Sequence, residues 1–303
     1  MPTHALFIIN KISVSFFVII VLDILFFGGS LKKMLPDTLA ELTWYYVLFG
    51  LPHIIASFVS YFSKDYITYY KKTILKGLLI SFCILALFLL FLPNLFIYFF
   101  IAYTLYHVAW QQLGICRRYI ENKILYRIWS LSGVTTAITL ALSIGGETFE
   151  KVPYSFFISL QTVGIVSLLL FFLTSLYVYR KSEYVTTTSL IITLSALAIL
   201  SGYYIVGILM IRFAHDVSAF AIYITHDTKQ QSLSIKNNLY SFFKIQPKYI
   251  IVFLPLLAIS VAFALQHYTS SIFVLVILML SCMHYHMEGI VWKRGTLHRA
   301  TIG

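Results

Sequence analysis

Apolar runs of about 20 residues recur along the whole chain, separated by short stretches that hold most of its charge. A helix needs a run of this length to cross the hydrocarbon core of a membrane, where every backbone polar group must be satisfied without water. The chain is 60% hydrophobic and only 11% charged, which excludes a water-soluble domain. The sequence therefore predicts an all-α, polytopic integral membrane bundle, organised as a single transmembrane domain over residues 1–303.

Ten segments are long and apolar enough to be spanning helices. They are residues 8–29, 42–62, 74–92, 95–116, 126–145, 154–179, 186–204, 206–226, 249–265 and 271–291. The seventh and eighth segments are separated only at Gly202 and Gly207, so they need a tight turn. One tilted helix with a re-entrant piece is the alternative for this region. The first segment lacks a small-residue cleavage site and is interpreted as a retained helix rather than a signal peptide.

Lysine and arginine are concentrated in alternate connections between these segments. Because cytoplasmic loops are enriched in Lys and Arg, this alternation predicts about ten helices with both termini in the cytoplasm, in a bacterial cytoplasmic (inner) membrane. The first connection, with Lys32 and Lys33, departs from the pattern. The 22 basic residues are spread over short loops rather than one continuous face, so no nucleic-acid partner is expected. Membrane lipids are the expected surroundings.

Six histidines fall inside segments that run toward the cytoplasm, and four of them have a similar spacing to the next connection: His53, His107, His215 and His284. Each precedes the charged residue that opens the following connection by nine to twelve residues. At a rise of about 1.5 Å per residue, all four lie in one layer roughly 13 to 18 Å from the cytoplasmic boundary. Ionisable groups are costly inside a membrane, so a common depth favours one shared metal site over four separate interhelical hydrogen bonds.

Helical spacing adds partners to this layer. Gln111 lies one turn after His107, and Glu288 lies one turn after His284, which makes both polar side chains candidates for catalysis. His286 is about 200° around the helix from His284, so only one of them can face the site, and His284 is preferred. Side chains that could orient a ligand imidazole or replace a ligand are Asp23, Asp216, His226 and His286. The histidines expected at the solvated surface are His4, His267 and His298.

Several imidazoles with one carboxylate suit a transition metal better than Mg²⁺ or Ca²⁺, which prefer oxygen ligands. Fe(II) is the first choice, with Zn or Cu as alternatives. A histidine-ligated iron with open positions activates O2, and burial in lipid gives access to an apolar substrate. Zinc would instead support hydrolysis, with Glu288 as general base. A transporter that moves metal ions or protons through the same layer is the alternative class, although no inverted repeat is visible.

The segment Phe49-Gly50-Leu51-Pro52-His53 resembles the Gly-x-Pro-His stretch of the Brp/Blh family of bacterial membrane β-carotene dioxygenases. The Tyr106-His107 pair, the later segment with His215 and His226, and the chain length are also similar to that family. The resemblance implies a multi-helix membrane metalloenzyme with iron held by histidines. It implies a non-haem iron oxygenase or dioxygenase that uses O2 on an apolar isoprenoid, carotenoid or acyl-lipid substrate.

Overall fold

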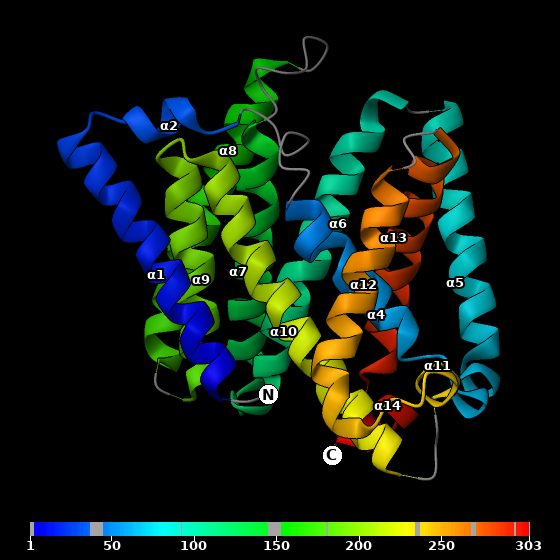
Figure 1. The fold of residues 1–303 in the computed structure, drawn as a ribbon. Helices are drawn as coiled ribbons and strands as arrows, with labels where there is room; N and C mark the ends of the chain where they lie inside the picture. Colours follow the sequence, from blue (N-terminus) through cyan, green and yellow to red (C-terminus); the bar gives the residue numbers. More distant parts are fainter. Residues whose placement is uncertain are drawn as a thin grey trace. The chain divides into compact units, whose positions relative to one another are not determined.

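The computed structural model describes residues 3–36, 45–91, 93–144, 153–179, 181–233, 237–267, 271–293 and 295–302. Every regular element within these ranges is a helix, so the all-α prediction is confirmed (Figure 1). Seven of the described helices are long and apolar enough to cross a membrane, and two shorter apolar helices cover residues 47–59 and 275–291. Their length and composition indicate an integral membrane protein.

Each of the ten segments expected from the sequence contains a helix. The helices in these segments are α1 (Thr3–Phe26), α4 (Leu51–Val59), α5 (Lys64–Phe91), α6 (Pro93–Ile115), α7 (Lys123–Ser143), α8 (Tyr154–Val178), α9 (Glu183–Leu200), α10 (Tyr204–Ser232), α12 (Ile250–His267) and α13 (Ser271–Val291). The short elements are α2 (Ser30–Met34), η2 (Tyr46–Gly50), η3 (Cys116–Arg118), α11 (Asn238–Phe242), η5 (Pro247–Tyr249) and α14 (Leu297–Ile302). Helices α5 and α10 extend well past their apolar runs into charged sequence.

The chain forms two compact units. Unit 1 contains residues 43–96 and 216–303, and unit 2 contains residues 2–42 and 97–215. Helix α10 belongs to both, because the boundary falls between His215 and Asp216. The expectation of a single domain over residues 1–303 stays a prediction.

Unit 1 is built around α4, which packs against α12 and α13, while α13 also packs against α5 (Figure 1). Small residues make the closest contact possible: Ala56 of α4 and Ala258 and Ala262 of α12 are completely buried in one apolar cluster. Close approach at small residues is a common way for helices to pack in membranes, where dispersion replaces the hydrophobic effect between helices. This packing holds α4 rigidly in the interior of unit 1.

The second predicted segment contains a change of helical geometry. Residues Tyr46–Gly50 form a π-helix, and α4 begins directly after it with Pro52 in its first turn. Proline has no backbone N–H, so the hydrogen-bond ladder cannot continue regularly across this point. This break in helical geometry lies just before His53. π-Helical turns of this kind are frequent at functional sites.

Unit 2 is a bundle in which α7 packs along α8, and α9 packs against α7, α8 and α1 (Figure 1). A Cβ atom added at Gly164 of α8 would lie only 2.6 Å from the Leu140 side chain of α7, so the two helices touch at a glycine. Ile20 of α1, Ala198 of α9 and the Tyr203 ring form a second buried cluster. These contacts fix α9 and the start of α10.

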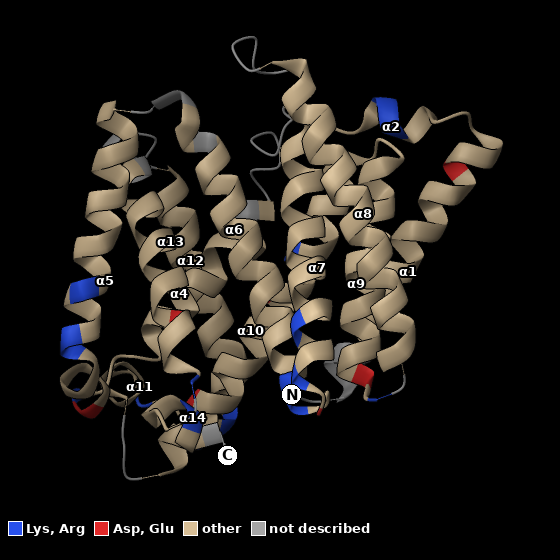
Figure 2. Ribbon diagram, turned by 180° about the vertical axis from the view of Figure 1, so that it is seen from behind, with Lys and Arg blue, Asp and Glu red and all other residues tan. Residues whose placement is uncertain are grey.

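Lysine and arginine gather at helix ends (Figure 2). In unit 1 they lie on the first turns of α5 and around α14, at the same end of that unit. In unit 2 they lie at the start of α7 and, at the opposite end, on α2, which carries Lys32 and Lys33. Lys32 and Lys33 depart from the alternation of basic connections in the sequence, and in unit 2 they also lie at the end opposite to the start of α7.

The junction of the seventh and eighth segments is a tight turn between two separate helices. Gly202 adopts a left-handed conformation with φ of 83° between α9 and α10. Gly207 lies against α9, where an added Cβ would be 2.6 Å from the carbonyl oxygen of Ser195, and the Ser195 hydroxyl donates to the Gly207 carbonyl at 2.5 Å. Within the described residues, the tight-turn interpretation is therefore the correct one.

Replacing Gly207 by alanine is expected to destabilise the protein by about 1–3 kcal/mol, because the new methyl group would lie 2.5 Å from the Ile199 side chain and 2.6 Å from the Ser195 carbonyl oxygen. Gly114→Ala is the matched control, because nothing lies within 4 Å of an added Cβ there. This control is expected to gain up to about 1 kcal/mol of helix propensity. Thermal unfolding in detergent measures both; equal effects of the same sign would contradict the packing described here.

Candidate metal centre

His53 lies in the first turn of α4 and is 1% exposed. Its Nδ1 atom is 3.1 Å from Oδ1 of Asp216 and 3.3 Å from the carbonyl oxygen of Phe49. The carbonyl oxygen can only accept a hydrogen bond, which favours the tautomer with the proton on Nδ1. In a neutral imidazole the lone pair is then on Nε2, the atom that would coordinate a metal. The Tyr45 hydroxyl donates to Oδ2 of Asp216 at 2.9 Å and steadies this carboxylate.

His284 is oriented in the same way from α13. Its Nδ1 atom is 2.8 Å from the Ser57 hydroxyl, which donates its own proton to the carbonyl oxygen of Ile54 at 2.6 Å. The Ser57 oxygen therefore accepts from His284, and Nδ1 of His284 carries a proton. As in His53, Nε2 is the atom that would coordinate a metal in this tautomer. Neighbours that fix the tautomer of a ligand histidine are typical of metal sites.

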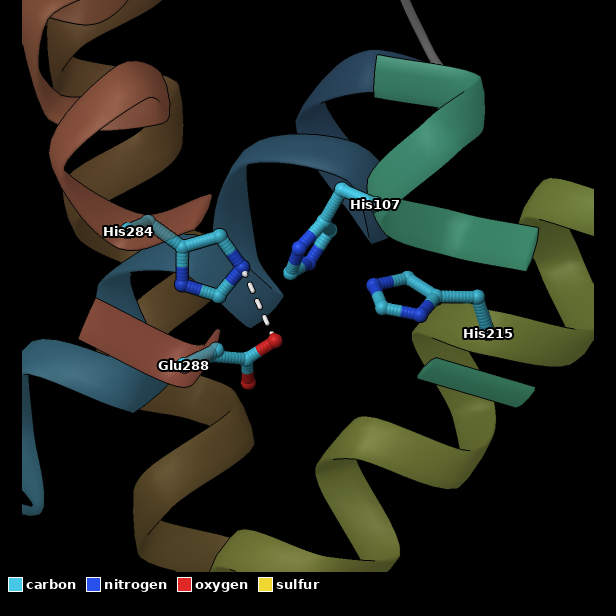
Figure 3. A group of neighbouring side chains, drawn as sticks. All are labelled: His107, His215, His284 and Glu288. Atoms are coloured by element: carbon cyan, nitrogen blue, oxygen red, sulfur yellow. Dashed lines mark ion pairs between the residues drawn. The ribbon is translucent and has the colours of Figure 1, made fainter. Parts of the chain in front are cut away.

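The two unit 1 imidazoles lie close together. The ring centroids of His53 and His284 are 5.0 Å apart with the planes at 77°. Nε2 of His284 is 3.5 Å from Oε2 of Glu288, one helical turn further along α13 (Figure 3). In the neutral tautomer these are two acceptors facing each other. Either a proton on Nε2 or a metal cation shared by the two atoms would make that arrangement favourable.

A second histidine pair lies in unit 2. His107 of α6 and His215 of α10 have ring centroids 5.1 Å apart with the planes at 78° (Figure 3). His215 is completely buried and His107 is 7% exposed. Gln111 follows His107 by one turn of α6 and is half-buried. Sequence reasoning thus selected the residues that form both pairs.

Asp216 and Glu288 are buried next to histidines, and both are candidates that the sequence singled out. Buried groups of histidine and acidic side chains in the described part of the chain could hold a metal ion. The donor set of imidazole nitrogens with carboxylate oxygens fits iron, zinc or copper. The residues present therefore fit a transition metal.

Asp23 was expected to orient a ligand imidazole, and the structure places it elsewhere. Its carboxylate accepts from the Tyr203 hydroxyl at 2.5 Å and from the backbone N–H groups of Leu31 and Lys32. It therefore ties the start of α2 to the end of α1. Equal depth along two helices does not imply proximity, and the imidazole-orienting role falls to Asp216 instead.

The remaining histidines separate into two groups. His286 is half-buried and faces α5, where a Cβ added at Gly77 would lie 3.0 Å from its ring. His284 therefore turns toward His53, as preferred from the sequence, while His286 points elsewhere.

His226 lies against His298 with the ring planes nearly parallel at 4.5 Å. His298 was expected to be solvated, and this was wrong: α14 folds back and buries it completely. His267 is exposed as expected, and the His4 side chain lies outside the described residues.

Sequence analysis missed Ser57 and Tyr45, which orient the histidine and carboxylate side chains. Ser57 could have been found, because it follows His53 by four residues and so shares a face of α4. Nothing in the sequence indicated Tyr45, because its partner Asp216 is 171 residues away.

No protein-family model, curated protein or solved structure matches this chain.

Ser57→Ala is expected to weaken metal binding by about 10- to 100-fold, because the hydroxyl that fixes the His284 tautomer is lost. Ser60→Ala is the matched control, since Ser60 lies one turn further along the chain and donates to Asp227 rather than to a candidate ligand. Competition with a chromogenic chelator measures the affinity. Equal losses in the two variants would contradict the proposed role of Ser57.

Proposed function

We propose that this chain is a membrane-embedded non-haem iron oxygenase or dioxygenase that acts on an apolar isoprenoid, carotenoid or acyl-lipid substrate. The single observation that carries the proposal is the pair of buried imidazoles, His53 and His284, whose rings lie 5.0 Å apart and whose Nδ1 atoms contact Asp216 and Ser57. Burying ionisable side chains among apolar membrane helices costs free energy, so such side chains usually have a function. Likeness to the Brp/Blh motif around His53 adds support.

The proposed ligands are the four histidines at matched depth, with Glu288 as a further ligand or an acid–base group. They are His53, His107, His215 and His284. Their common depth along the membrane-spanning segments supports a shared centre that holds one metal or a close pair.

Iron, when bound, would supply O2 activation at open coordination positions. The protein's own residues would do the rest. Asp216 and Ser57 would hold the imidazoles in place, Glu288 and Gln111 would be available to bind or exchange protons near the substrate, and the apolar helices would exclude water. Zinc with Glu288 as general base, or copper, would use the same ligands.

We further propose that the chain crosses the bacterial inner membrane with ten helices and has both termini in the cytoplasm. Each of the ten predicted segments contains a helix, and seven long apolar helices with two shorter ones account for nine of them. The basic residues on the first turns of α5 and around α14 mark one end of unit 1 as cytoplasmic (Figure 2). In this topology the histidine layer lies in the inner leaflet, open to lipid-soluble substrates.

The second candidate function is a metal-ion or proton-coupled transporter that uses the same histidines. The π-helical break at Tyr46–Gly50 favours it, because transporters often interrupt helices beside their ion site. The two functions differ in what they consume: an oxygenase consumes O2 and changes its substrate chemically, whereas a transporter moves a solute unchanged.

Elemental analysis of protein purified from membranes is the first test, with about one iron per chain expected. Expression in carotenoid-producing cells, followed by profiling of pigments and lipids, is the second. Products that appear with the wild-type chain, fail to appear with His53→Ala and still appear with His286→Ala would support the oxygenase. A metal-loaded protein that leaves every pigment and lipid unchanged would move the proposal to transport.

A further inference from the structure

A second buried polar cluster lies in unit 1, centred on His226 near the end of α10. Nδ1 of His226 is 2.7 Å from Oδ1 of Asp227, and Nε2 is 3.0 Å from the Tyr66 hydroxyl of α5. The Tyr66 hydroxyl is also 2.8 Å from Oγ1 of Thr301, in the C-terminal helix α14. Asp227, His226 and Tyr66 are completely buried, whereas Thr301 is half-buried. The result is a continuous chain of hydrogen bonds from α14 to a carboxylate.

Three groups contact the Asp227 carboxyl group. The Ser60 hydroxyl donates to Oδ1 at 2.7 Å, and the Tyr240 hydroxyl donates to Oδ2 at 2.5 Å. Nδ1 of His226 is the third, 2.7 Å from Oδ1. Both oxygens of this buried carboxyl group are therefore engaged, and one of them lies next to the His226 ring.

The hydroxyl groups around His226 can satisfy two protonation states of its ring. When the ring is neutral, Tyr66 donates to Nε2 and Thr301 donates to the Tyr66 oxygen. When the ring is charged, Nε2–H donates to Tyr66, Tyr66 donates to Thr301, and Thr301 donates to the carbonyl oxygen of Leu297, 3.0 Å away. The two arrangements differ by one proton and by two hydroxyl rotations. Every named atom keeps a partner in both.

We infer that Thr301, Tyr66 and His226 form a proton-transfer site, with Asp227 as its counter-charge. A proton arriving at Oγ1 of Thr301 displaces the hydroxyl proton of Thr301 to the Tyr66 oxygen, and the Tyr66 proton passes to Nε2 of His226. One proton enters, one N–H bond forms, and both hydroxyl groups are restored. The site thus takes up a proton from the α14 end of unit 1 and stores it beside a buried carboxylate.

The other groups around His226 do not compete for this proton. His298 of α14 lies parallel to His226, and burial, followed by repulsion from His226, lowers the pKa of His298 to about 2. The Trp292 indole meets the His226 ring edge-on and does not titrate. The Tyr61 and Tyr70 rings contact His298 instead of His226. Within the described residues, Asp227 and Tyr66 are the titratable groups hydrogen-bonded to His226.

This inference does not depend on the proposed metal chemistry, although its position suggests a use. Ser60, which donates to Asp227, lies one turn from Ser57, which contacts His284. Helix α4 thus carries both the inner end of the proton-transfer site and part of the candidate metal centre. An oxygenase that needs protons, or a proton-coupled transporter, could draw on the stored proton.

Nitrogen NMR of ¹⁵N-histidine-labelled protein in lipid nanodiscs tests the site directly, with the His226 signals assigned by their loss in His226→Gln. We expect a neutral Nδ1–H form and a charged form to exchange with each other across a pH series. Tyr66→Phe is expected to slow the exchange at least about tenfold, because the ring keeps its shape but loses the transferring hydroxyl.

Tyr70→Phe is the matched control, since Tyr70 is one turn away on α5, equally buried, and bonded to His298 rather than His226. It is expected to change the exchange rate by less than about twofold. Thr301→Val provides a second variant at the half-exposed end, where folding is not at risk, and is also expected to slow exchange. A His226 ring that stays in one protonation state over the whole range, or equal slowing by Tyr66→Phe and Tyr70→Phe, would overturn the inference.

Discussion

His284→Ala is expected to leave almost no bound metal, with an affinity lower by on the order of 100- to 1,000-fold. Structural metal sites gain about 10–16 kcal/mol from about four ligands, so each ligand contributes several kcal/mol. His284 is completely buried, its tautomer is fixed by Ser57, and its Nε2 faces Glu288. No other imidazole of α13 can replace it, because His286 faces α5.

The matched control for this prediction is His286→Ala. It removes the same side chain from the same helix two residues away, so it reproduces any general effect of cutting an imidazole from α13. Metal content near the wild-type value is expected in this control. Elemental analysis and chelator competition measure both variants. Metal loss in His286→Ala equal to that in His284→Ala would show that α13 does not present His284 as described.

The apolar runs were sufficient to locate the long helices, because burial in lipid leaves a helix as the only way to satisfy the backbone of a single segment. They were not sufficient to locate helix ends. Helix α5 begins at Lys64, ten residues before the expected start at Ile74, because a backbone that is helical in lipid can continue into water with its hydrogen bonds intact. Charge marks the membrane boundary, not the end of a helix.

Depth along the chain selected the histidines that pair in each unit, since a constant rise per residue converts sequence spacing into height. Depth could not predict which way a side chain points around its helix, or where that helix lies in the plane of the membrane. Asp23 has a similar predicted depth and contacts Tyr203 instead of a histidine. His298 was misplaced for a related reason: the short polar C-terminus gave no sign that α14 would pack its histidine against His226. Such contacts depend on tertiary packing between segments far apart in sequence.

A comparison of His107→Ala with His284→Ala is expected to show that the two side chains serve one metal although they belong to different units. Each single variant is expected to lose most of the metal. The double variant is then expected to lose little more affinity than either single variant, because residues that act as one site are strongly non-additive. Double-mutant analysis of affinity and of metal stoichiometry measures this coupling.

Separate sites in the two units would give a different pattern. If the His107–His215 pair and the His53–His284 pair each held a metal, each single variant would remove only its own half of the total, and the double variant would remove the sum. The common depth of the four histidines in the sequence makes the shared site the expectation. If the four histidines hold one metal, displacing one imidazole is expected to lower the metal affinity of the whole site.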